Sequence, residues 1–375
     1  MSLVELMASL VIVLVVMAIA TSAYLKLIGG YKAQGKMAES YMSNLCGLEL
    51  LRYDIEMAGH GLPYDMNGNV YSEASEGVNG NLAAQVAPKA LNDAPNIPGA
   101  FSFSNGEVAN NTKPDTLAVK STMAAINTTS RKWSYIYRTG ASPQVKAWAP
   151  TSPLNPLLDF DNNERFIILD SINRGLQPGS SALAGPWGTD TSKRWCYRFI
   201  ETGFGTGYYH DSSAIPSPSV NQNINLIYGV SETADPLRMP FNRVDYFLSR
   251  SSLPTRCDPG SYTLYRATIN HGDGGRLYQP IIDCVRDFQI AFQLDPGGWR
   301  TDLAGLTVQQ VREQVRQVRV FILFQEGAMD KNYSFNGTLN LGDAVTGTLS
   351  SHDLTGSHYR WKIQTMTVKP MNLQQ

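Results

Sequence analysis

Residues 1–28 read MSLVELMASLVIVLVVMAIATSAYLKLI, and this apolar segment sets the organisation of the whole chain. Residues 6–23 contain no charged side chain. A helix of about 20 residues rises roughly 30 Å, which matches the hydrocarbon core of a bilayer. The segment therefore predicts one membrane-spanning helix. Its apolar surface includes Leu3, Leu6, Val11, Leu14 and Ile19.

Glu5 is the one acid in this apolar segment. A carboxylate in hydrocarbon costs on the order of 3 kcal/mol, so an acid at such a position usually has a partner. The segment also lacks the small-residue cleavage site that ends an ordinary secretory signal peptide. We therefore expect residues 1–28 to stay with the protein and Glu5 to be neutralised by another group.

The composition of the 375 residues argues against nucleic-acid binding and for an oxidising compartment. Lys plus Arg number 31 and Asp plus Glu 32, so the formal net charge is −1 and there is no basic excess for a phosphate backbone. The four cysteines, an even number, fit one or two disulfides. We expect Cys46, in a helix, to be a free thiol. Cys196, Cys257 and Cys284 are the disulfide candidates, and the sequence leaves their pairing open.

Residues 29–58 continue the helix but change its character. Apolar residues recur every three or four positions, which is typical of an amphipathic helix with one face against a protein core. These residues are Tyr41, Leu45, Leu48, Leu51, Ile55 and Ala58. Gly59, Gly61 and Pro63 then end the helix. We expect this half to pack on a globular head.

Residues 59–241 form a large loop-rich β region by composition, with strands expected at 133–137 and 166–169. Asp159, Asp161 and Asn163 alternate as the first ligands of a calcium loop do. Glu164, however, stands where that loop needs glycine. We expect a polar turn there, with calcium as the alternative and no other cofactor.

Residues 242–375 predict an antiparallel sheet. Alternating strands at 244–248, 262–267 and 280–292 follow one another closely, as in a meander. Thr307 and Gln310 have the spacing of a capping box at the start of a short helix. An apolar strand at 318–325 is followed by an expected loop of about 30 residues and a last strand from Tyr359. The fold class is therefore α+β, with a long N-terminal helix packed on an antiparallel sheet that carries a large inserted region.

Residues 2–6 (SLVEL) resemble the start of a mature type IV pilin, in which an acid lies four residues after the processed first residue. Residues 56–62, 245–248, 263–266, 282–290, 318–320 and 359–361 are similar to successive blocks of PilW-type minor pilins. The resemblance covers the first 63 residues and roughly 242–373. It implies that Met1 is the processed, methylated N-terminus and that Glu5 pairs with the terminal amine of a neighbouring subunit.

The same resemblance implies a structural role. A PilW-type protein is a minor pilin that primes assembly at or near the pilus tip. It waits in the bacterial inner membrane with its head in the periplasm, then joins an extracellular pilus. The implied partners are other pilin subunits, prepilin peptidase, the inner-membrane assembly platform and a tip adhesin. A J-type pseudopilin of type II secretion and a membrane-tethered periplasmic binding protein or enzyme are the alternatives.

Enzyme motifs are missing from the sequence. None of the five histidines lies in an HExxH or GxSxG context. His352 and His358, next to Asp353, are expected in a surface loop. The six tryptophans could stack on sugars only if some of them cluster on the surface, and core packing is their commoner use.

Overall fold

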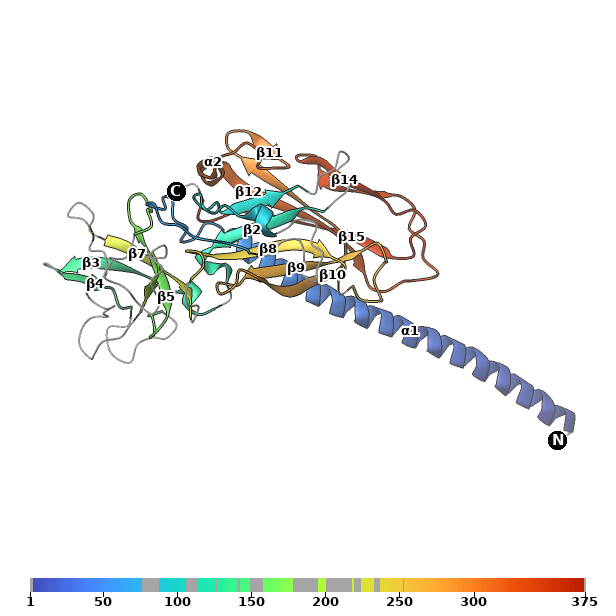
Figure 1. The fold of residues 1–375 in the computed structure, drawn as a ribbon. Helices are drawn as coiled ribbons and strands as arrows, with labels where there is room; N and C mark the ends of the chain where they lie inside the picture. Colours follow the sequence, from blue (N-terminus) through green and yellow to red (C-terminus); the bar gives the residue numbers. More distant parts are fainter. Residues whose placement is uncertain are drawn as a thin grey trace.

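The computed structural model describes residues 3–75, 88–105, 114–125, 127–139, 142–148, 158–177, 195–199, 218, 224–232, 237–251 and 253–373. The longest element is helix α1 (Leu3–Glu56), whose 54 residues extend about 81 Å at 1.5 Å per residue. It runs without interruption through Gly29 and Gly30, and its N-terminal half projects from the head (Figure 1). The predicted long helix is confirmed.

The main sheet has eight strands, and all its neighbouring strands are antiparallel. Their order is β1-β2-β8-β9-β10-β12-β15, with β11 paired to β10. The strands are β1 (Phe101–Ser104), β2 (Thr116–Ser121), β8 (Asn242–Ser249), β9 (Tyr262–Ile269), β10 (Arg276–Leu294), β11 (Gly298–Arg300), β12 (Val315–Glu326) and β15 (Arg360–Val368). The predicted β8–β9–β10 meander and the α+β class are confirmed.

The C-terminal half of α1 packs on this sheet against β10, β12 and β15. Leu48, Leu51 and Ile55 are buried there, as the apolar periodicity predicted, whereas Leu45 of the same predicted face is 36% exposed. Gly47 faces β10 so closely that a Cβ atom would lie 2.4 Å from the carbonyl oxygen of Ile281. Glycine weakens a helix interior by about 1 kcal/mol relative to alanine. Its presence here is explained by the close approach of helix and strand.

A second, five-stranded antiparallel sheet lies at the opposite end of the head from the N-terminus of α1 (Figure 1). Its order is β4-β3-β7-β5-β6. The strands are β3 (Trp133–Thr139), β4 (Ser142–Val145), β5 (Arg165–Asp170), β6 (Tyr197–Arg198) and β7 (Ile224–Ser231). One face buries its own small core, and on the other face Ile167, Leu169 and Tyr228 join the main core. Strands predicted at 133–137 and 166–169 are confirmed.

Two sequence-based boundaries differ from the structure. The main sheet does not begin at residue 242, because β1 and β2 come from the region 59–241 and extend its edge. The expected loop after β12 contains a hairpin, β13 (Thr338–Asp343) with β14 (Gly347–Asp353). Its Leu341 and Leu349 pack on Phe321 and Leu323 of β12. The hairpin is stabilised by this burial against a distant strand. Its Gly- and Ser-rich sequence alone therefore predicted a loop.

The remaining helical elements are short. Helix α2 (Val308–Gln314) begins with the predicted capping box, in which Thr307 Oγ1 accepts from Gln310 N and the Gln310 side chain accepts from Thr307 N. Among the described residues, the 3-10 turn η1 (Pro88–Leu91) precedes β1, and η2 (Thr122–Ala124) and η3 (Thr129–Arg131) lie between β2 and β3.

Candidate functional site

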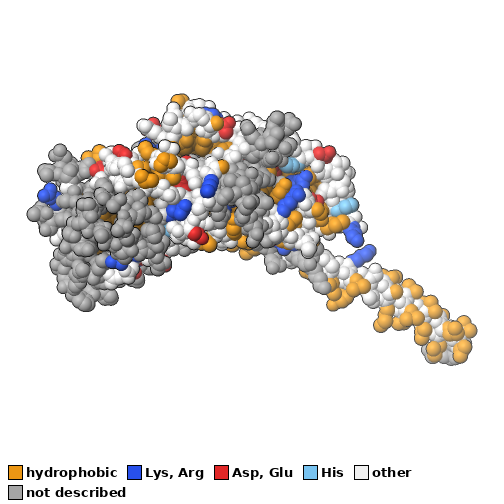
Figure 2. Space-filling view, viewed as in Figure 1, with side chains coloured by type: hydrophobic (Ala, Val, Ile, Leu, Met, Phe, Trp, Pro, Cys, Tyr) orange, Lys and Arg blue, Asp and Glu red, His pale blue; other side chains and the backbone are white. Residues whose placement is uncertain are grey.

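The first functional feature is the bare apolar half of α1. From Leu3 to Tyr31 the helix is long and apolar enough to cross a membrane by its length and composition. The five predicted membrane-facing residues are 57–80% exposed, and apolar side chains cover this end of the molecule (Figure 2). They are Leu3, Leu6, Val11, Leu14 and Ile19. Such a large apolar surface marks contact with lipid or with other helices.

Glu5 lies in the first turn of the same helix. A negative charge is favourable at that end because the backbone N–H groups there carry a partial positive charge. Met1 lies outside the described residues, so the pairing of Glu5 with the terminal amine of another subunit stays a prediction.

The second feature is a buried cluster that joins α1 to the head. Asp54 Oδ2 of α1 accepts hydrogen bonds from Tyr246 OH on β8 at 2.5 Å and from Arg266 Nε on β9 at 2.7 Å. Tyr246 and Arg266 are direct neighbours across the two strands. Burial lowers the pKa of the Arg266 guanidinium, but Asp54 and Tyr246 together raise it more, so the net shift is upward. Burial raises the pKa of the Asp54 carboxyl, and its contacts with Arg266 and Tyr246 offset only part of that shift. These short contacts fix the helix to two strands.

A second charged network lies inside the main sheet. Asp245 accepts from Arg243 at 2.8 Å and from Arg276 at 2.8 Å, and Arg243 also pairs with Glu73 at 2.9 Å. Lys120 reaches the same Glu73 carboxylate at 2.8 Å. All five side chains are buried. Sequence analysis missed this network, since charged residues at alternate strand positions are normally on a solvated face.

We predict that this network makes the head sensitive to acid. Burial alone would raise the pKa of the Asp245 carboxyl, but Arg243 and Arg276 lower it more, and Lys120 and Arg243 act likewise on the pKa of Glu73. A carboxyl whose pKa is lowered by folding contributes stability above its unfolded pKa of about 4, and that stability is lost as the pH falls through the folded pKa.

The free energy of unfolding should therefore fall in two steps. It falls first below about pH 6.5, because burial lowers the pKa of His60 and of His271 to about 4, so these rings take up protons only in the unfolded chain. It falls again below about pH 4, where the buried carboxylates of the network are protonated. Urea unfolding of the full chain at stepwise pH measures this. Asp302→Asn, at an exposed aspartate, is the control and should leave the pH profile unchanged. A wild-type profile that stays flat below pH 4 would contradict the prediction.

The predicted calcium residues contact protein groups. Asp159 is buried and accepts from a backbone N–H at 2.7 Å, and Asp161 lies 3.2 Å from the ammonium of Lys132. Asn163 has a positive φ of 71° and forms the turn. Glu164 pairs with Lys132 at 2.8 Å. Lys132 thus supplies the positive charge in this loop. Within the described ranges, no three His, Cys, Asp or Glu residues gather as a metal site.

The structure also settles the cysteine pairing. Cys257 and Cys284 form a disulfide with a Cα–Cα distance of 5.0 Å. Cys46 is an exposed thiol, as expected. The candidate Cys196 is wrong, because it is a buried thiol beside β6 of the five-stranded sheet, whereas the disulfide lies on the main sheet.

His352 is not in a surface loop. It lies on β14, and its Nε2 is 2.7 Å from Asp287 Oδ2 on β10. Ser350 donates to the same carboxylate oxygen. A nucleophilic relay needs the serine to donate to the histidine. Ser350 and His352 instead both contact Asp287 Oδ2, which is the acceptor. These contacts hold the hairpin β13–β14 on the main sheet.

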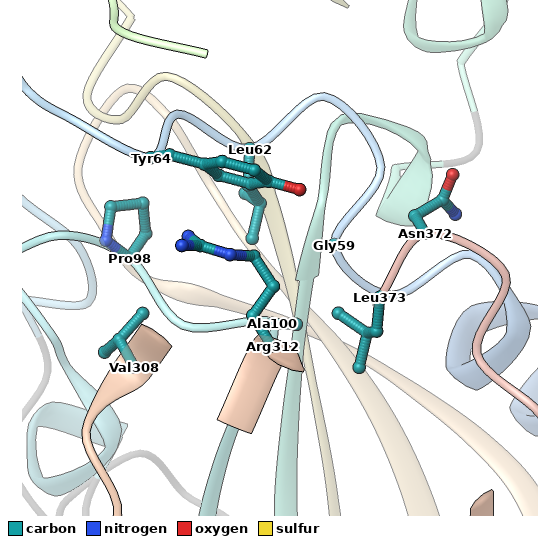
Figure 3. Close-up of a pocket in the computed structure, with 9 residues that line it drawn as sticks. All are labelled: Gly59, Leu62, Tyr64, Pro98, Ala100, Val308, Arg312, Asn372 and Leu373. Atoms are coloured by element: carbon teal, nitrogen blue, oxygen red, sulfur yellow. The ribbon is translucent and has the colours of Figure 1, made fainter. Parts of the chain in front are cut away.

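A cavity of about 190 Å³ lies beyond the C-terminal end of α1, and we refer to it as the distal cavity. Its walls are residues 59–62, Tyr64, Trp133, Arg174, Tyr228 and Asn372. The segment 59–64 separates it from the small pocket in Figure 3, where the Arg312 guanidinium stacks 3.6 Å from the centre of the Tyr64 ring. In the same view Asn372 and Leu373 point in opposite directions.

Some polar groups that line the distal cavity make hydrogen bonds within the protein, and others do not. Asn372 Nδ2 is buried and makes no hydrogen bond within the described part of the chain. His60 Nδ1 lies 3.0 Å from Thr122 Oγ1, and the same hydroxyl oxygen lies 3.3 Å from the His60 carbonyl oxygen. Burial and the nearby charge of Arg174 lower the pKa of His60 to about 4. The imidazole is therefore neutral, and one of its two ring nitrogens carries a proton while the other carries a lone pair.

Comparisons of the chain with models of protein families, with curated proteins and with solved structures found no match in any of the three.

Proposed function

We propose that this protein is a membrane-anchored structural subunit of a type IV pilus, a minor pilin of the PilW type. The observation that carries the proposal is the two-part helix α1. Its N-terminal half is exposed and mainly apolar, and its C-terminal half is packed on an antiparallel sheet. A helix of this kind serves both as a membrane anchor and, after extraction, as a shaft that packs against identical shafts.

In this proposal the subunit waits in the bacterial inner membrane with its head in the periplasm. A disulfide in the head is compatible with that oxidising compartment. Prepilin peptidase processes the N-terminus, and the assembly platform lifts the helix into the filament. There the Glu5 carboxylate pairs with the terminal amine of a neighbouring subunit. That pairing neutralises two charges that would otherwise be costly among apolar helices.

The size of the head favours a rare position in the filament. About 320 residues follow α1, and those that the structure describes form an eight-stranded sheet, a five-stranded sheet and the hairpin β13–β14. A head this large is bulky for a subunit repeated along a thin shaft. We therefore propose that it primes assembly at or near the tip, beneath an adhesin.

Replacing Glu5 by leucine tests the assembly role. We expect Glu5→Leu to remain in the membrane, since the apolar span becomes longer, but to disappear from sheared filaments, because the charge that aligns neighbouring helices is gone. Immunoblots of membrane and sheared-filament fractions from the native host measure both. Glu49→Leu makes the same change on an exposed part of α1 and should assemble normally. Unchanged filament content of Glu5→Leu would contradict the proposed role of Glu5, and absence of the wild type from sheared filaments would favour a membrane-tethered protein that does not assemble.

A further inference from the structure

The distal cavity is continuous with a row of aromatic side chains on the five-stranded sheet. Trp133, Tyr135 and Tyr137 of β3 alternate onto one face, spaced about 6.7 Å apart along the strand. Trp148 packs edge-on against Trp133 and Tyr135, with ring centres 4.9 and 6.3 Å apart. We refer to these four residues as the aromatic row. Trp133 belongs to both the row and the cavity.

These rings are accessible and held in place. Trp133 is 44% exposed, so the distal cavity opens to solvent at this residue. Tyr135, Tyr137 and Trp148 are partly exposed. The indole Nε1 of Trp148 donates to the Trp133 carbonyl at 2.8 Å, which fixes the two tryptophans relative to each other. A rigid aromatic surface loses little conformational entropy when a ligand binds to it.

The polar groups beside Trp133 specify the chemistry of a ligand. Asn372 Nδ2 offers a donor, and His60 Nε2 offers a donor or an acceptor according to the tautomer of the ring; neither makes a hydrogen bond within the described residues. A hydroxyl group can both donate and accept, so a polyhydroxylated ring satisfies both kinds of site. The faces of aromatic rings are electronegative and attract the polarised C–H groups on the flat side of a pyranose.

We propose that the distal cavity and the aromatic row bind a β-linked oligosaccharide. One pyranose ring enters the cavity against Trp133, with its hydroxyls on Asn372 and His60, and the next rings follow over Tyr135 and Tyr137. The cavity is smaller than the roughly 300–1,000 Å³ typical of drug-sized ligands, and therefore suits one ring. Sugars with equatorial substituents fit because both faces of their rings are flat.

The location suits an external ligand. The cavity follows the C-terminal end of α1, about 81 Å of helix away from Leu3. The five-stranded sheet is at the end of the head remote from the apolar helix (Figure 1). A ligand can therefore reach the site while the helix is held in a membrane or a filament.

Binding is measured on the full chain in lipid nanodiscs, which avoids detergents with sugar headgroups. Cellotriose and chitotriose are the probes, and saturation-transfer NMR with tryptophan fluorescence is the readout. We expect saturable binding of at least one probe with a Kd of about 1 mM. Trp133→Ala should weaken it at least about tenfold, because it removes the ring of the cavity.

Leucine is similar in size to asparagine but cannot donate a hydrogen bond, so Asn372→Leu should weaken binding several-fold. This variant provides a second test if Trp133→Ala fails to fold. Trp299→Ala, at a tryptophan of β11 outside the site, is the matched control and should bind like the wild type. Absence of saturable binding by both sugars overturns the proposal, as does wild-type affinity in both cavity variants. The assay requires no filament assembly, so its outcome is independent of the proposed pilin role.

Discussion

Replacing Asp54 by alanine should destabilise the protein by about 3–5 kcal/mol, which is the cost of removing one partner from a buried ion pair. The guanidinium of Arg266 would stay buried next to Tyr246 with its carboxylate partner gone. Stabilities of 5–15 kcal/mol are usual for folded domains, so the loss is a large fraction of the total. Urea unfolding of the full chain in nanodiscs, followed by tryptophan fluorescence, measures it.

The matched control is Glu49→Ala on the same helix. Glu49 also pairs with an arginine, Arg52, at 2.8 Å, but the pair is exposed and such pairs contribute little. The double variant Asp54→Leu with Arg266→Met should recover much of the loss, because an apolar pair of similar volume often replaces a buried ion pair without cost. Equal losses for Asp54→Ala and Glu49→Ala would show that the buried cluster does not anchor α1.

Removing the disulfide should cost about 3.5 kcal/mol in the free energy of unfolding. Cys257 and Cys284 are 27 residues apart, and closing a loop of that length reduces the entropy of the unfolded chain by about this amount. The double variant Cys257→Ser with Cys284→Ser tests it by urea unfolding. Treating the wild type with a reductant should reproduce the result.

Other contacts keep the Cys257 loop near its place in the folded state. Gln325 Oε1 accepts from Asp258 N at 2.8 Å, and Gln325 Nε2 donates to the Arg256 carbonyl at 2.9 Å. The variant should therefore fold, with the effect residing mainly in the unfolded state. Cys46→Ser, at the exposed thiol, is the control. Identical unfolding curves with and without reductant would contradict the prediction.

The candidate sites show how far local sequence patterns reach. The membrane-spanning half of α1, with Glu5 near its start, could be predicted from the uninterrupted apolar run in the sequence. The distal cavity could not be predicted, because His60, Trp133 and Asn372 are far apart in the sequence and meet only in the folded chain. The six tryptophans indicated that a sugar platform was possible in principle, but only the structure places Trp133 and Trp148 together on the surface.

Buried charges show a second limit. Lys120, Arg243 and Asp245 lie in strands whose residues are buried on both faces. Alternation assigns a polar residue to the solvated face of a strand, so it is informative only when one face meets water. These charges are buried because each has an opposite charge at hydrogen-bond distance, and that partner comes from another strand or loop.

The sequence by itself determined the elements that depend on neighbours along the chain. These are the unbroken apolar helix, the amphipathic half that follows it, the β8–β9–β10 meander and the capped helix α2. The periods of helix and strand and the capping box act over a few residues, so they are readable without a fold. Only the tertiary structure decided the division into two sheets, the choice of Cys284 for Cys257, the anchoring of Asp54 and the distal cavity. Those features depend on contacts between distant segments, and their free energy comes from burial that exists only after the chain has folded.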